Sequence, residues 1–123
     1  MPGGRVRLAA SRRTTRLRAV EAQAGWMTRT LRALVEVESP SDDKAAVDAA
    51  VRLTAEFVEA CGGQVKLHKQ KHFGDVLEVR FGPARGRRVL LLGHLDTVWP
   101  LGTLKTMPWR ERDGRFFGPG VLD

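Results

Sequence analysis

A histidine and an aspartate with His-x-Asp spacing follow an apolar run in the second half of the chain. The segment reads RRVLLLGHLDTVWP over residues 87–100, and His94 and Asp96 come directly after the run at residues 89–92. Continuous Val/Leu runs are typical of strands buried on both faces. Ligands of open α/β sheets bind just beyond the carboxyl ends of such strands. The pattern therefore predicts that His94 and Asp96 are site residues at the edge of a sheet.

This spacing suits metal binding. In an extended backbone, residues two apart point to the same side, so the Asp96 carboxylate can accept a hydrogen bond from one ring nitrogen of His94. Such a bond fixes the tautomer and makes the other nitrogen a better metal ligand. The alternative is a structural histidine beside a core strand, which the two-residue pattern does not exclude.

A second pattern, GPGVLD, occupies residues 118–123. Its two glycines and proline predict a tight loop leading to Asp123. A carboxylate in this place is a hard oxygen ligand that can bridge two divalent metal ions. Taken alone, the pattern fits a surface turn followed by a helix cap equally well.

Two helices are expected to come before the His-x-Asp segment. The first covers about residues 26–37, where the apolar positions have helical spacing. The loop ESPSDD interrupts it, because Pro40 disfavours the helical conformation at Ser39. The second runs over about residues 43–61, with a capping residue among Ser41, Asp42 and Asp43, and it ends at Gly62-Gly63.

Strands are expected in the rest of the chain. Residues 64–70 and 75–82 alternate apolar and polar side chains, as half-exposed strands do. The apolar run at 89–92 predicts a central strand, and Asp113-Gly114 predicts the tip of a hairpin. Helices followed by strands indicate an α/β fold, in which we expect a mixed sheet flanked by helices.

The net charge of +7 is concentrated at the N-terminus. Residues 1–20 hold six arginines and no acidic residue, whereas the other 103 residues hold 15 basic and 14 acidic side chains. A nucleic-acid footprint is expected on the folded surface, so the near-neutral body argues against nucleic acid as a partner. No apolar stretch approaches the roughly 18 residues of a membrane span. The single cysteine, Cys61, excludes an internal disulfide and a cysteine-based zinc motif.

Residues 1–26 are expected to form a disordered Arg-rich extension, with the folded domain at residues 27–123 and the natural start at Met27. A transit peptide and a nucleic-acid-binding arm are the alternatives for this extension. Because it has no apolar core of the kind found in secretory signals, we expect a cytoplasmic protein.

The two site patterns together resemble a known family. GHLDTV and GPGVLD, with 29 residues from His94 to Asp123, are similar to the metal-binding segments of the zinc-dependent aminoacylase, dipeptidase and glutamate-carboxypeptidase family. TRTLRALVEVESPSDD, FVEACGGQV and WRERDGRFFGPG also resemble its opening helix and loop, its second helix and strand, and the hairpin before its second motif. The resemblance covers about residues 27–123, and the glutamate-carboxypeptidase branch is the most similar.

The resemblance implies a pair of zinc ions, for which cobalt or manganese can substitute. His94 would bind one metal, Asp123 would bridge both, and Asp96 would be the catalytic-site residue that orients His94. The substrate would be a small peptide or an N-acyl amino acid, whose amide bond is hydrolysed. The resemblance implies no nucleic acid or membrane partner. It allows a homodimer only for a full-length protein.

The chain departs from the family pattern after Asp123. The glutamate that serves as general base and the later metal ligands of the family have no counterpart in these 123 residues. Residues 27–123 are therefore expected to be the N-terminal part of a metallopeptidase catalytic domain, a fragment that lacks activity alone. The alternatives are a non-enzymatic remnant or a metal-binding fragment, and a nucleic-acid-associated protein that uses its basic tail.

Overall fold

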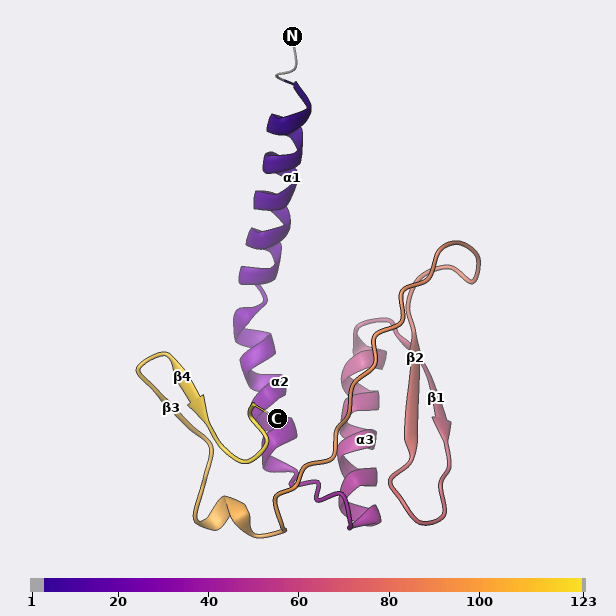
Figure 1. Ribbon diagram of the computed structural model, residues 1–123, viewed down its shortest axis with the longest axis vertical. Coiled ribbons are helices and arrows are strands. Elements are labelled where there is room, and N and C mark those ends of the chain that lie inside the picture. The colour runs from indigo at the N-terminus through magenta and orange to yellow at the C-terminus, as the bar shows by residue number, and fades with distance from the viewer. Residues whose placement is uncertain (1–3, 123) are drawn as a thin grey trace. The chain divides into compact units, whose positions relative to one another are not determined.

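The computed structural model describes residues 4–122, with side chains from residue 13 onward. The chain divides into two compact units, Met1–Leu31 and Arg32–Asp123. Figure 1 shows the helices and strands of both. The candidate site lies within the second unit.

The first unit contains α1 (Gly4–Glu21) and the beginning of α2 (Ala24–Glu36). The extension that we expected to be disordered is thus helical over most of its length (Figure 1). Alanine, leucine and arginine are strong helix formers, so local propensity accounts for this helix. Its apolar side chains Leu17 and Val20 are exposed. No helix in the described part of the chain is long and apolar enough to cross a membrane.

In the second unit, α3 (Lys44–Ala60) confirms the second predicted helix. Asp43 is its N-cap, and the Asp43 side chain accepts a hydrogen bond from the Ala46 N–H at 3.0 Å. Beyond the C-terminus, Gly62 adopts φ +83°, a conformation that favours glycine. The inner face of α3 buries Val47, Ala50 and Val51, which with Val35 of α2 form the small buried apolar core of the described residues.

The helix α3 packs against an antiparallel hairpin of β1 (Gln64–His68) and β2 (Val76–Arg80). The register pairs Val65 with Val79 and Leu67 with Leu77. Val65, Leu67, Leu77 and Val79 therefore share one face, as the alternating sequence predicts.

The predicted central strand at residues 89–92 is wrong. These four side chains are between 84% and 92% exposed, and their backbone forms no strand (Figure 1). A strand buried on both faces needs partners along its edges and cover on both sides, and the described residues supply neither. We call residues 89–92 the apolar segment.

The predicted hairpin at Asp113-Gly114 is confirmed. β3 (Arg110–Arg112) pairs with β4 (Arg115–Phe117), and both turn residues have positive φ, 52° and 68°. Two positive φ values are the signature of a type I′ turn. A short 3₁₀ helix, η1 (Thr103–Lys105), precedes this hairpin. The described strands form two separate antiparallel sheets. The α/β class is thus confirmed, without the expected mixed sheet.

Candidate functional site

The loop before α3 lies against the His-x-Asp segment. Pro40 and Thr97 form a parallel bridge, in which the Thr97 N–H donates to the Ser39 carbonyl at 2.7 Å and the Ser41 N–H donates to the Thr97 carbonyl at 3.0 Å. The buried Ser39 hydroxyl also donates to the Leu95 carbonyl at 2.7 Å. These bonds join two loops that are distant in sequence and fix the backbone around Asp96.

The imidazole of His94 is oriented mainly by a backbone oxygen. Its Nδ1 lies 2.9 Å from the Asp96 carbonyl oxygen and 3.5 Å from Oδ1 of the Asp96 carboxylate. Both atoms can only accept, so in the neutral ring we assign the proton to Nδ1. The other nitrogen, Nε2, then keeps its lone pair, and the side chain is exposed. This is the tautomer that allows a histidine to bind a metal ion through Nε2.

The Asp96 carboxylate is held by a residue whose role the sequence did not reveal. Ser41 Oγ donates to Asp96 Oδ2 at 2.6 Å, and this hydrogen bond is the main reason why the pKa of Asp96 lies below its ordinary value. Asp96 therefore stays ionised at neutral pH. From the sequence, Ser41 was considered only as a helix cap, and Asp43 performs that role instead.

A groove of about 670 Å³ lies next to these residues. Its walls come from α3, from residues 73–77 and from residues 91–96, and Ser41, His94 and Asp96 all contribute to its lining. A ligand in this largely apolar groove can therefore contact the polar side chains of Ser41, His94 and Asp96.

The structure brings the two predicted site patterns together. A Cβ atom built on Gly120 would lie 2.8 Å from Thr97 Cγ2, and Gly120 adopts φ +73°. The loop of the second pattern thus passes directly over the residue that follows Asp96, at an approach that only glycine permits. Asp123 itself lies outside the described residues.

The carboxylate of Glu38, in the loop between α2 and α3, anchors η1. The Glu38 side chain accepts hydrogen bonds from the Gly102 and Leu104 N–H groups, both at 2.9 Å. These bonds lower the pKa of Glu38. They hold the chain that follows the His-x-Asp segment against the start of the 38–41 loop.

Within residues 4–122, no group of three or more His, Cys, Asp or Glu side chains is arranged to hold a metal ion. The other two histidines serve elsewhere. His68 pairs with Glu78 at 2.8 Å on the β1–β2 hairpin, and His72 lies exposed in the turn. The described part of the site therefore offers one free imidazole nitrogen, with a carboxylate beside it.

The chain was compared with known proteins. No family model matches it. It is 29% identical over 97 residues to Carboxypeptidase G2 of Pseudomonas sp. (strain RS-16), a match that covers 77% of this chain. The match covers 23% of that protein, so the chain spans about a quarter of the length of its relative. The chain is thus distantly similar to a carboxypeptidase over about three quarters of its length.

Proposed function

We propose that residues 27–123 form the N-terminal part of the catalytic domain of a metal-dependent hydrolase. The substrate would be a small peptide or an N-acyl amino acid, cleaved at its amide bond as a carboxypeptidase does. The similarity to Carboxypeptidase G2 supports the reaction class. The observation that carries the proposal is the orientation of His94, whose Nδ1 is engaged by the Asp96 carbonyl while Nε2 is left free.

In this proposal His94 would hold a zinc ion through Nε2, and Asp123 would supply a carboxylate to the same site. A bound zinc ion would lower the pKa of a coordinated water to about 7 and polarise the scissile carbonyl. Asp96 keeps the imidazole oriented and adds a negative charge next to it. Cobalt and manganese are expected to substitute for zinc.

The described residues supply too few ligands for a complete zinc site, because structural and catalytic sites use three or four protein ligands. We therefore propose that activity belongs to a longer protein, in which further residues complete the site and cover the apolar segment. We propose that this longer protein is cytoplasmic, with neither nucleic acid nor a membrane as a partner, and that any homodimer belongs to it and not to the 123-residue chain.

The ligand role of His94 can be tested on the chain itself. Cobalt(II) added to the ¹⁵N-labelled chain is expected to broaden the imidazole signals of His94 before those of His68 and His72. The His94→Ala variant should lose the tightest cobalt-binding step, whereas His72→Ala, the matched control, should retain that step. Equal broadening of all three histidines would contradict the proposal.

The reaction can be tested on the product of the complete gene. Chelator-sensitive release of glutamate from an N-acyl-glutamate is the expected result, and the 123-residue chain assayed in parallel should release none. Since general acid–base groups contribute about 10²- to 10⁴-fold each, a chain without them should fall below detection.

A second candidate follows from the incomplete ligand set within the described residues. The chain would then be a non-enzymatic fragment that binds one metal ion weakly through His94. Selective cobalt binding at His94, together with no hydrolysis by the complete gene product, would favour this function.

A further inference from the structure

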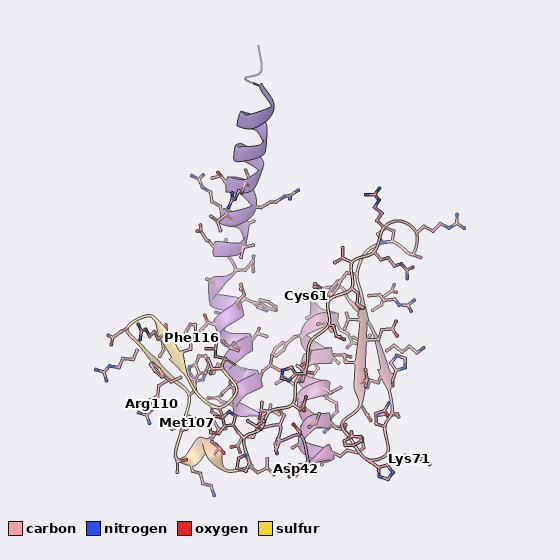
Figure 2. The ribbon with its side chains drawn as sticks, in the orientation of Figure 1. Asp42, Cys61, Lys71, Met107, Arg110 and Phe116 are labelled. Atoms are coloured by element: carbon pink, nitrogen blue, oxygen red, sulfur yellow. The ribbon has the colours of Figure 1, made fainter. Side chains whose placement is uncertain are left out.

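A second cavity, of about 650 Å³, lies beside the β3–β4 hairpin. Its walls are mostly apolar, and they include Trp99, Met107, Phe116, Phe117, Val121 and Leu122. Among the described residues that line it, Arg110 and Arg112 are the charged ones. Figure 2 shows Met107, Arg110 and Phe116 close to one another around the hairpin. We call this cavity the hairpin pocket.

Positive charge is concentrated on one face of the hairpin. Alternate residues of a strand share a face, so Arg110 and Arg112 project together from β3. The register places Arg112 directly opposite Arg115. Like charges in directly opposite positions destabilise a strand pair. The hairpin therefore places three arginines on one face, at a cost to its own stability.

Little on the hairpin compensates this charge. Arg112 Nε lies 3.3 Å from Asp113 Oδ2, but both side chains are exposed, and such pairs contribute at most about 1 kcal/mol. Glu111 lies opposite Phe116, on the other face from the arginines. The three arginines of the hairpin therefore outnumber its two acidic residues, which leaves an excess of positive charge at the edge of an aromatic wall.

We propose that the hairpin pocket binds a small organic anion with an aromatic or branched apolar body. The carboxylate of the ligand would pair with Arg110 and Arg112, whose planar guanidinium groups match carboxylate geometry. Its apolar body would lie against Trp99 and Phe117. The cavity has the size of small-molecule sites, which range over about 300–1,000 Å³.

The hairpin pocket and the groove beside His94 have no lining residue in common. Ser41, His94 and Asp96 line the other groove and are absent from the walls of the hairpin pocket. Binding of an anion in the hairpin pocket therefore requires neither zinc nor hydrolysis. Failure of the metal proposal would leave this inference intact, and the reverse also holds.

Two probes of nearly the same shape isolate the role of charge. Naphthalene-2-acetate and naphthalene-2-acetamide are titrated into the full chain, and binding is measured by calorimetry. We expect the acid to bind at a ratio of one to one and about tenfold or more tighter than the amide, since hydrogen bonds to charged groups are the stronger ones. The tryptophan fluorescence of the chain should change in parallel, because Trp99 lines the pocket.

Substitutions then identify the groups that bind the anion. Arg110→Gln and Arg112→Gln are each expected to remove most of the preference for the acid. Arg110→Lys should keep part of it, because the charge remains while the planar fork is lost. Lys71→Gln is the matched control, since it removes one positive charge from an exposed turn outside the pocket. Both arginines are exposed, so circular dichroism should report an unchanged fold in each variant.

Three results would overturn the proposal. Equal affinity for acid and amide would show that the arginines do not recognise the negative charge of the ligand. Displacement of the naphthalene acid by a single-stranded oligonucleotide, with steep salt dependence, would indicate a nucleic-acid surface instead. Displacement of the probe as the protein self-associates would show that a second copy of the chain fills the pocket.

Discussion

Ser41 and Asp96 are 55 residues apart in sequence and are joined by a hydrogen bond of 2.6 Å between Oγ and Oδ2. The same hydroxyl lies 3.1 Å from the Thr97 carbonyl. The backbone bridge between Pro40 and Thr97 keeps the two segments in register. Ser41 thus determines which way the Asp96 carboxylate faces. It therefore also determines where the negative charge beside His94 lies.

The Ser41→Ala variant should free the Asp96 carboxylate while leaving the backbone bridge in place. We expect several side-chain rotamers for Asp96 and a loss of about 1 kcal/mol in the free energy of unfolding, the usual contribution of one hydrogen bond. Scalar couplings of Asp96 and urea denaturation measure the two effects. Ser41→Thr keeps the hydroxyl and should behave as the unmodified chain. A single unchanged rotamer in Ser41→Ala would show that Asp96 is held by other contacts.

Asp75 is a buried carboxylate that ties the β1–β2 turn to α3. It accepts hydrogen bonds from Lys69 Nζ at 2.7 Å, Lys44 Nζ at 2.9 Å and the Gln70 N–H at 3.0 Å. The Lys69 ammonium is the main cause that holds the pKa of Asp75 well below its ordinary value, followed by the Gln70 N–H and Lys44. We expect Asp75→Asn to lower the free energy of unfolding by roughly 2–3 kcal/mol at pH 7.

The effect of Asp75 should depend on pH with a defined sign. Its pKa is lower in the folded than in the unfolded chain, where it lies near 4. The ionised carboxylate therefore stabilises the fold fully above about pH 5, and this contribution shrinks as the pH falls toward 2. Urea denaturation from pH 7 to pH 3 should show that the free energies of unfolding of the unmodified chain and of Asp75→Asn approach each other as the pH falls. Asp113→Asn, at an exposed turn position, should show little change at any pH. If the difference between the two free energies of unfolding did not change with pH, Asp75 would stabilise the fold through the shape of its side chain and not through its charge.

Gly120 permits the contact between the two site patterns. In Gly120→Ala, the new methyl group would meet Thr97 at 2.8 Å, and the φ of +73° is unfavourable for alanine. We expect a loss of about 1–3 kcal/mol and a displaced 118–120 loop. Gly114→Ala is the control: it has φ +68° but open space around the new methyl group, so it reports the backbone cost alone. Equal losses in both variants would mean that the contact with Thr97 contributes nothing.

The apolar segment should govern association of the isolated chain. Its four side chains are exposed and its backbone belongs to no sheet, so it is free to pair with the same segment of a second chain. We expect self-association at micromolar concentrations, which sedimentation velocity will detect. Leu91→Lys should reduce it without a change in thermal stability, because Leu91 is 90% exposed and contributes no packing. A monodisperse chain with a cooperative thermal transition would contradict this expectation.

Local sequence determined those elements whose signals act over a few residues. The Asp43 cap and Gly62 delimit α3, because a capping side chain and a positive φ are local properties. Asp113-Gly114 specified the β3–β4 turn for the same reason. His94 and Asp96 also stood out from their residue types and spacing alone, and so did the loop that contains Gly120.

Tertiary structure decided everything that needs a partner distant in sequence. Ser41 was read from the sequence as a cap because nothing local indicates that Asp96 lies beside it. The backbone carbonyl of Asp96 orients His94 more closely than the expected carboxylate does, and this depends on how the 95–97 backbone pairs with the 39–41 loop. Residues 89–92 have the composition of a central strand but form none, because a strand exists only through hydrogen bonds and cover that neighbouring elements supply.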